Sequence, residues 1–370
     1  MSYKVRFVNP GKLYLQLKPE LDAAYSHVME TGSLIDRQEL WTFEEKLAEF
    51  VGTKYAVGLN SGYDSLHMSL RAAGIGPGDE VILPAHTFVA TASAVVNVGA
   101  KPVLVDVYPD HNINVEKIYE AITNRTRGII PVHLNGRMAD MPSIIEMAEK
   151  HGLVVVEDAC QSLGASQDGK KAGSWGLTGC WSFYPFKILG GYGDGGALTT
   201  NDSNVADFAR RMRFNGEDRE TGEYHGHGFT CLLDNLQAAF LTVKLRHLPE
   251  WIEKRRGIAE QYRKAFTGID DLALPHFNGD DGREDVFQNY VVRSKSGDAF
   301  SDHMRKNGVE VLVQWRKPYY RHEALLLADR GFPETEAISA EVCSLPMAVE
   351  LDDDDVETVI RTVRSFYGLS

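Results

Sequence analysis

The sequence predicts an α/β protein, with a large domain built on a mainly parallel mixed sheet flanked by helices and a small α+β C-terminal domain. Two observations lead to this prediction. Short apolar runs alternate with helix-length segments from residue 55 to residue 156, which is typical of a parallel sheet with helices on both faces. The 370 residues are also enough for one large domain and a smaller one.

The elements of the large domain are expected in the order of the chain. A helix is predicted over residues 36–51, with Thr42 and Glu45 spaced as a capping box and Gly52 as the stop. Buried strands are then predicted at 55–59, 81–83, 102–107, 128–132 and 153–156, and a further pair at 180–184 and 196–200. Helices are expected between the first five, near 62–73, 87–98, 114–122 and 140–151.

A long helical stretch over 234–266 leads into the C-terminal part, and Pro249 is expected to break or kink it. We therefore predict a large domain over residues 1–248, including an N-terminal helical segment, and a small domain over 249–370. The small domain should contain strands at 286–292 and 309–313. A final helix should open with the acidic run 352–355, which suits the positive end of a helix dipole better than it suits a metal site.

Composition narrows the class of protein. The net charge of −13 argues against binding to nucleic acid or to an anionic membrane surface, because either would need a basic face. The four cysteines show no metal-ligand spacing and are expected to be reduced thiols: Cys160, Cys180, Cys231 and Cys343. The first residues are too polar for a signal peptide, and no apolar run approaches the ~20 residues that span a bilayer. We expect a soluble cytoplasmic protein without a metal.

Lys187 and Asp158 are the candidate catalytic pair. Lys187 directly precedes the glycine cluster 190–196, and Asp158 closes an apolar run that is predicted to be a buried strand. A desolvated lysine can act as an amine nucleophile toward an aldehyde, and an aspartate can keep a cofactor's ring nitrogen protonated. Together they suggest pyridoxal 5'-phosphate, bound to Lys187 as a Schiff base and tuned by Asp158.

Other candidate residues also follow predicted strands. The run NSGYDS at 60–65 opens a helix whose backbone amides could hold a phosphate, although a capped turn without a ligand is an equal alternative. Phe88 could stack on a heteroaromatic ring or simply fill the core. His86 and His133 are expected to be structural. Because ligands of open α/β sheets bind at the carboxyl edge, these segments are expected to lie near one another.

With these segments in order, the chain resembles the DegT/DnrJ family of sugar aminotransferases, which are fold-type-I enzymes dependent on pyridoxal phosphate. The likeness covers roughly residues 30–365 and is most specific around the lysine and the aspartate; it is carried by residues 60–70, 74–81, 84–94, 103–106, 131–141, 155–165, 182–202, 234–239 and 344–347. It implies that Lys187 binds the cofactor and moves the proton. It also implies a homodimer with shared active sites.

The resemblance assigns further cofactor contacts. Asp158 would pair with the pyridine nitrogen, Gln161 would contact the ring hydroxyl and Phe88 would stack on the ring. The loop residues Gly62, Tyr63 and Asp64 would hold the phosphate through their backbone, together with the Ser182 hydroxyl.

Two departures from the family pattern concern the phosphate, since Tyr63 replaces a threonine and Thr230 replaces an asparagine that reaches the neighbouring subunit's cofactor. Leu232 also stands where the family has an arginine. Nearer the C-terminus, Trp315 is a candidate to stack on the sugar, and Arg316 or Lys317 to meet a charged substrate group, although a surface loop would explain this run equally well.

The leading function is transfer of an amino group, from glutamate as the expected donor, to a keto sugar that is expected to be nucleotide-linked. Such a reaction would serve amino-sugar biosynthesis for a lipopolysaccharide, another surface polysaccharide or a glycosylated product. The alternatives are a pyridoxamine-dependent sugar dehydratase of the same fold, in which a histidine replaces the lysine, and a transaminase of a free keto sugar acid. A regulator without turnover is a third, which an intact Lys187 and Asp158 argue against.

Overall fold

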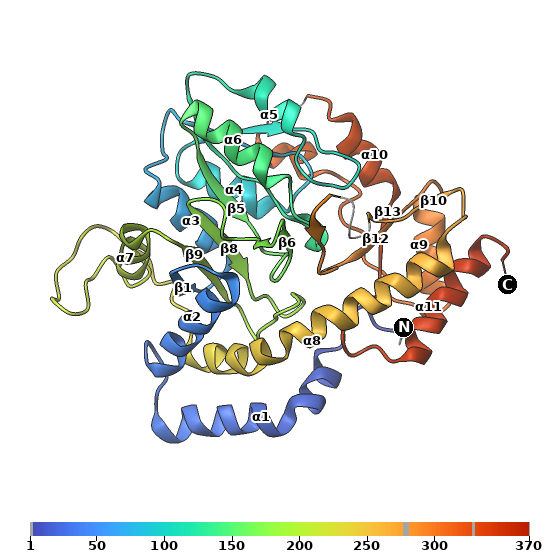
Figure 1. Ribbon diagram of the computed structural model, residues 1–370, viewed down its shortest axis with the longest axis horizontal. Coiled ribbons are helices and arrows are strands. Elements are labelled where there is room, and N and C mark those ends of the chain that lie inside the picture. The colour runs from blue at the N-terminus through green and yellow to red at the C-terminus, as the bar shows by residue number, and fades with distance from the viewer. Residues whose placement is uncertain (1–2, 277–280, 328–329, 370) are drawn as a thin grey trace.

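The computed structural model describes residues 3–276, 281–327 and 330–369, and its centre is a seven-stranded sheet (Figure 1). The strands lie in the order β1-β9-β8-β5-β4-β2-β3. Their bounds, in chain order, are β1 Tyr55–Leu59, β2 Glu80–Pro84, β3 Lys101–Val105, β4 Thr126–Ile129, β5 Val154–Asp158, β8 Thr178–Ser182 and β9 Gly196–Thr200. Strand β9 is antiparallel to both of its neighbours, whereas the other pairs are parallel, so the sheet is mixed and mainly parallel as predicted.

Two layers of helices cover the sheet because successive residues of a strand point to opposite faces. In β2, Val81 and Leu83 pack in one apolar cluster with helices α3 (Gly62–Ala72) and α4 (Val89–Asn97). Ile82 packs in another, which contains residues of α2 (Gln38–Val51), α5 (Val115–Ala121), α6 (Met141–His151) and α8 (Asn235–Phe266). Helix α7 (Ser203–Met212) contributes to a smaller cluster over β1 and β9.

The predicted helices and strands of the large domain are confirmed, but the predicted start of α2, with its capping box, was wrong. The helix begins at Gln38 with Arg37 as its N-cap, so Thr42 lies inside it and accepts a hydrogen bond from Gln38 instead of capping the helix. At its other end Gly52 adopts the left-handed conformation, as predicted. The N-terminal helical segment is α1 (Pro10–Thr31), which packs against α8.

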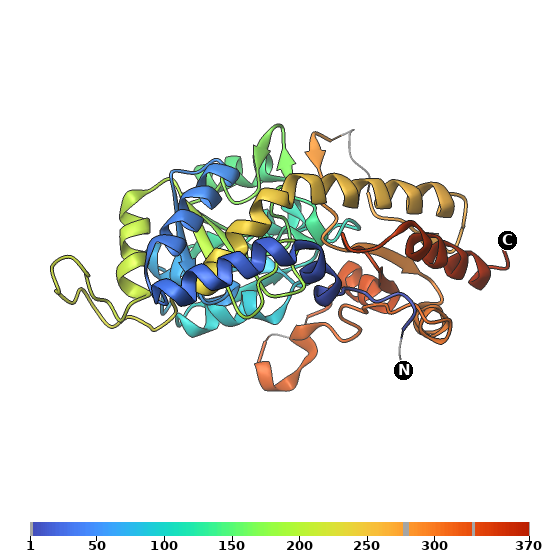
Figure 2. The ribbon, with the colours of Figure 1, turned by 90° about the horizontal axis from the view of Figure 1, so that it is seen from below.

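Helix α8 is continuous through Pro249, which therefore does not break it, and it changes direction along its length (Figure 2). Its residues up to Ile252 belong to the core of the central sheet, and those from Ile258 onward belong to a second core. The second core also contains Val5, because the N-terminal segment returns to pair with Val309. The placement of a domain boundary at residue 248 stays a prediction.

The second core is built on a small sheet in the order β10-β12-β13, with β10 at Leu272–Ala273, β12 at Tyr290–Ser294 and β13 at Val342–Leu345. Helices α9 (Gly297–Lys306) and α11 (Asp353–Phe366) contribute to this core, whereas Ile338 of α10 (Pro333–Glu341) packs with Val291 and Val342 in a separate small cluster. The strand predicted at 286–292 thus begins four residues late, since Phe287 has a left-handed backbone. The strand predicted at 309–313 is reduced to two single bridges, at Val309 and Leu312.

Helix α11 confirms the interpretation of the acidic run, because Asp352 and Asp355 form a capping box at its start. A third small sheet, which the sequence did not reveal, joins β6 (Ser166–Gln167) to β7 (Lys170–Lys171) and to β11 (Arg283–Glu284). Short 3-10 turns occur at Leu134–Gly136, Tyr319–Arg321 and Glu323–Leu325. Within the described part of the chain, no helix combines the length and the apolar character that a membrane crossing requires.

Candidate active site

Lys187 and Asp158 lie at neighbouring positions on the carboxyl edge of the sheet. Asp158 is the last residue of β5, and Lys187 lies in the turn after β8, the strand that pairs with β5. Burial lowers the pKa of Lys187, while Cys160 and the Asp158 carboxylate oppose that shift. A lysine in such a setting is more readily available as a neutral amine than an exposed one, which is what a nucleophile toward an aldehyde requires.

The Asp158 carboxylate is buried but not saturated with hydrogen bonds. Thr91 Oγ1 donates to Asp158 Oδ2 over 2.8 Å, and the amide of Cys160 donates to Oδ1 over 3.3 Å. The side chain of Asp158 is held in place by Thr91, whose own hydroxyl lies 2.9 Å from that of Thr87. Because a carboxylate has about four acceptor positions, Asp158 retains room for a further donor such as a protonated ring nitrogen.

The start of α3 forms a cradle beside this pair. A Cβ on Gly62 would lie 2.7 Å from Cys160 Sγ and 2.9 Å from Ser182 Cβ, so only glycine lets the helix approach β5 and β8 this closely. Ser61 caps the helix by accepting from the amide of Asp64. In the described chain, the amides of Gly62 and Tyr63 donate to no protein group. These amides at a helix N-terminus next to Ser182 suit a phosphate.

The side chains of Tyr63 and Asp64 are engaged by other protein groups, and the backbone amide of Asp64 is also used, because it donates to Ser61 Oγ. Asn97 Nδ2 donates to the Tyr63 hydroxyl over 2.6 Å, and the Tyr63 ring stacks on His67. The Asp64 carboxylate accepts from Ser61 Oγ over 2.7 Å, and burial raises its pKa. The Tyr63 side chain is thus held by Asn97 and His67.

Phe88 is not a core residue, which removes one of the two alternatives for it. It is the N-cap of α4, is 55% exposed, and stacks on Trp315 with the ring centroids 6.3 Å apart. Arg316 contacts Asp298 and the backbone carbonyl of Ser339, and the expectation that Arg316 or Lys317 meets a charged substrate group stays a prediction. Lys317 is exposed.

A cluster of side-chain amides surrounds Gln161. Its Oε1 accepts from the amide of Asn135 over 2.9 Å and from Asn289 Nδ2 over 3.5 Å. Asn289 also donates to the side-chain oxygens of Asn135 and Gln314, which brings three segments of the chain to one point. The Gln161 oxygen is thus used within the protein, and its Nε2 donates to no partner in the described residues, which leaves it available to a ring hydroxyl.

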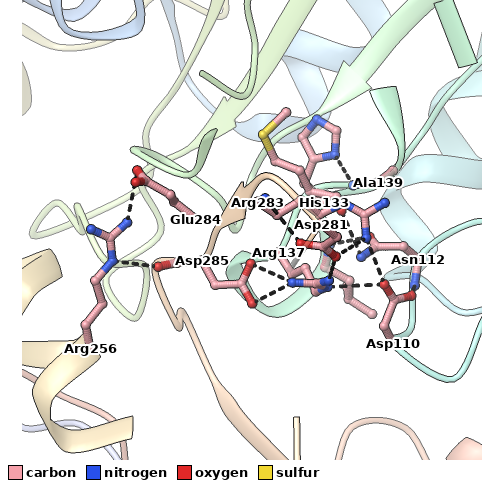
Figure 3. Close-up of polar contacts among 12 residues, drawn as sticks. Asp110, Asn112, His133, Arg137, Ala139, Arg256, Asp281, Arg283, Glu284 and Asp285 are labelled. Atoms are coloured by element: carbon pink, nitrogen blue, oxygen red, sulfur yellow. Dashed lines mark hydrogen bonds and ion pairs between the residues drawn. The ribbon is translucent and has the colours of Figure 1, made fainter. Parts of the chain in front are cut away.

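His133 and His86 are structural, as predicted. His133 is fully buried between Glu157, 3.0 Å from its Nε2, and the amide of Ala139, which donates to its Nδ1 (Figure 3). His86 is buried against His111, with their ring nitrogens 3.3 Å apart, and burial lowers the pKa of both.

The segment after α7 projects from the body of the molecule (Figure 1), and Thr230 lies where this segment returns and pairs with Phe214. The next residue is in contact with the loop that leads into the cradle, because the carbonyl of Cys231 accepts from the amide of Asn60. Its side chain is exposed and donates to Asn215 Oδ1 over 3.1 Å. Leu232 is half-buried and pairs with Leu59. Within one chain, neither residue has a described contact with Lys187 or Asp158.

Sequence reasoning missed the residues that hold the lysine loop. Gln237 accepts from the amide of Tyr192, and Lys244 donates to the carbonyl of Gly190; Gln288 contacts the backbone on both sides of Lys187. Gln237 and Lys244 lie on α8, about two helical turns apart, and that spacing could have suggested a common face. Gln288 carried no local signal.

Comparison with known proteins agrees with this geometry. A model of the DegT/DnrJ/EryC1/StrS aminotransferase family matches residues 16–364. The chain is 38% identical to a pleiotropic regulatory protein of Geobacillus stearothermophilus, with 98% of each chain covered. It is 36% identical to a dTDP-3-amino-3,4,6-trideoxy-alpha-D-glucose transaminase of Streptomyces venezuelae, covering 98% of this chain and 96% of that one.

A UDP-2-acetamido-2-deoxy-3-oxo-D-glucuronate aminotransferase of Pseudomonas aeruginosa is also 36% identical, with 96% and 98% covered. Among solved structures, DesV of S. venezuelae in complex with a ketimine intermediate aligns with a TM-score of 0.95 at 36% identity, covering 99% of both chains. NtdA of Bacillus subtilis with bound PMP aligns with a TM-score of 0.90 at 28% identity, covering 98% of this chain and 85% of that one. The predicted family and fold class are confirmed.

Proposed function

Because the chain belongs to the DegT/DnrJ/EryC1/StrS aminotransferase family, we propose that it is a pyridoxal-phosphate-dependent aminotransferase acting on a nucleotide-linked keto sugar. The observation that carries this proposal is the desolvated Lys187 beside Asp158 at the carboxyl edge of the sheet. Two transaminase relatives that act on dTDP- and UDP-linked sugars support the substrate class.

The residues present fit the cofactor. The free amides of Gly62 and Tyr63, with the Ser182 hydroxyl, offer donors to a phosphate, and the glycine leaves the room that a side chain would fill. Phe88 is exposed for stacking, and Asp158 has unfilled acceptor positions. When bound, pyridoxal phosphate supplies an aldehyde that bonds to amines and a ring that withdraws electrons from the adjacent carbon.

The protein's own groups then orient and move the proton. Asp158, held in place by Thr91, would keep the ring nitrogen of the bound cofactor protonated by hydrogen bonding and charge. With the cofactor bound, the Lys187 amine, whose pKa is lowered by burial, would accept at Nζ the proton from the α-carbon of the amino donor and pass it to the cofactor's reacting carbon. In the second half-reaction it would carry a proton from that carbon to the former carbonyl carbon of the sugar. The amino donor is an amino acid, and glutamate is our expectation.

The proposed enzyme is a homodimer with shared sites. Thr230 and its projecting segment are exposed in one chain, and Phe88, Tyr184 and Phe186 near the site are about half exposed, at 55%, 50% and 48%. A second copy would cover these aromatic side chains and bring its Thr230 toward the phosphate. A species that turns over while it is monomeric by light scattering would contradict the shared site.

The proposed setting is amino-sugar biosynthesis for a surface polysaccharide or a glycosylated product, in the cytoplasm. In the described chain all four cysteines are free, which suits a reducing compartment. A regulator is the second candidate, since one relative is called a pleiotropic regulatory protein. Amine transfer to a panel of nucleotide-linked keto sugars and free keto sugar acids separates these alternatives.

The first experiment is spectroscopic. Wild-type protein mixed with pyridoxal phosphate should develop a near-visible absorbance band that glutamate converts. Lys187→Ala should abolish the band. Lys244→Met is the control, because Lys244 is a second buried lysine, with its pKa lowered to about 8, which lies on α8 and donates to the carbonyl of Gly190 in the lysine loop. A wild-type protein that stays colourless, or a band lost in Lys244→Met but kept in Lys187→Ala, would refute the proposal.

A further inference from the structure

The segment from Asp285 to Asn289, between β11 and β12, lies across the large domain and contacts it at successive residues. We call it the strap. The Asp285 carboxylate accepts from Arg137, which also pairs with Asp110 and Asp281 (Figure 3). The amide of Val286 donates to the carbonyl of Gly136. Asn289 reaches Asn135 and Gln161, as described above.

Gln288 is the strap residue that meets the lysine loop. Its Oε1 accepts from the amide of Ile188 over 2.7 Å, and its Nε2 donates to the carbonyl of Phe186 over 3.0 Å. One buried carboxamide thus engages the peptide groups on both sides of Lys187. A primary amide offers a donor and an acceptor side by side at every pH, whereas a carboxyl of the same size does so only when it is protonated.

We call the two hydrogen bonds of Gln288 to the lysine loop the clamp. The backbone of the strap that carries Gln288 is itself held in place. Arg255, buried in α8, donates to the carbonyls of Phe287 and Gln288 over 2.9 and 3.3 Å. Gly136 lets the strap come close, because a Cβ there would lie 2.6 Å from the Gln288 amide nitrogen. Because its backbone is held in this way, Gln288 restricts the movement of the lysine loop that it contacts. Such supporting contacts determine how accurately a reacting group is placed.

We propose that Gln288 is a positioning residue for Lys187, setting the direction of its amine through the backbone at Phe186 and Ile188. The role of Lys187 in this inference rests on the proposed function, whereas the hydrogen bonds of the clamp do not depend on it. It predicts effects on loop protection and on the amine-transfer rate together.

The clamp is tested by hydrogen exchange of the full chain, with and without pyridoxal phosphate. In Gln288→Leu the amide of Ile188 loses its acceptor, so its exchange should accelerate by about tenfold. Gln167→Leu is the matched control, because Gln167 is equally buried and its Oε1 accepts from the amide of Met141, far from the lysine loop in sequence. Unchanged exchange at Ile188 in Gln288→Leu would overturn the clamp.

Positioning is tested by the rate at which glutamate converts the absorbance band in a single turnover. Gln288→Leu should slow this step by about tenfold to a hundredfold with a smaller effect on the affinity for glutamate. Gln288→Glu should recover as the pH falls from about 8 to about 5, because a protonated carboxyl again offers a donor beside an acceptor. Gln288→Leu should show no such recovery.

The outcomes separate the two proposals. If wild-type protein forms the band but Gln288→Leu and Gln167→Leu convert it at the same rate, the positioning role is wrong while the proposed function stands. If wild-type protein forms no band, the proposed function fails, and the positioning role fails with it even where exchange shows the clamp. If Gln288→Leu does not fold, the single-turnover rate of Gln288→Glu at high and low pH, compared with that of wild-type protein, tests the positioning role instead.

Discussion

Glu157 and Asp158 are neighbours at the end of β5, but their side chains point to opposite faces of the sheet and differ in how many hydrogen bonds they accept from the protein. Glu157 is fully buried and accepts hydrogen bonds from His133 and from three backbone amides of the turn at 173–176. Asp158 accepts one hydrogen bond on each oxygen, one of them from Thr91. A carboxylate saturated by its own chain holds the fold, whereas one with open positions is available to a ligand.

The largest effect is expected from Asp158→Asn. An asparagine can still accept from Thr91, but it carries no charge to keep a ring nitrogen protonated. We expect turnover to fall by about 10²–10³-fold in steady-state assays, with the free energy of unfolding little changed. Near-wild-type turnover would show that the Asp158 carboxylate does not take part in the reaction.

Glu157→Gln should give the reverse pattern. The new NH₂ group would face donors that now bind an oxygen, so we expect the free energy of unfolding to fall by about 3 kcal/mol in urea titrations. Turnover per folded molecule should be unchanged. If activity is lost without loss of stability, the division between the two faces is mistaken.

A third carboxylate, Asp285 of the strap, sharpens the comparison through its pH dependence. Burial raises its pKa to about 6, and the charge of Arg137 opposes that rise. Because the folded state binds this proton more tightly than the unfolded state, Asp285 contributes stability below about pH 4 that is lost as the pH rises through about 6.

The stability of wild-type protein relative to Asp285→Asn should therefore rise by up to about 3 kcal/mol as the pH is lowered from 7 to 4. Denaturant unfolding at several pH values measures this difference. A difference that stays constant across the range would mean that the Arg137 pair, and not burial, controls the titration.

The smallest effect is expected from Thr91→Val, which removes one hydroxyl donor to Asp158 and nearly keeps the shape. Turnover should fall by about fivefold to tenfold. Thr91→Ser restores the hydroxyl and should restore most of the rate. If valine and serine behave alike, Thr91 acts through packing alone.

The sheet could be predicted because its strands are buried on both faces and therefore appear as continuous apolar runs. Lys187 and Asp158 could be predicted because each carries a distinctive residue type beside a strand or a glycine cluster. The strand expected at 309–313 failed for a different reason, since pairing of single residues with Val5 and Ser344 depends on segments far away in the chain.

The supporting groups of the site were out of reach for the same reason. Gln288 acts on peptide groups about one hundred residues earlier in the chain, at separations of 100 and 102. The partners of Arg316, Asp298 and Ser339, could not be predicted either, because they are set by the packing of α9 and α10. Neither contact leaves a periodic or local mark in the sequence.

Helix α8 connects these observations. It contributes Leu241, Leu245 and Leu248 to the core under the central sheet, and Ile258, Tyr262 and Phe266 to the core of the small sheet. Because one continuous helix has buried residues in both cores, we expect unfolding of one core to be coupled to unfolding of the other. Heating should therefore give a single cooperative transition, with the calorimetric enthalpy equal to the van't Hoff enthalpy for the whole chain.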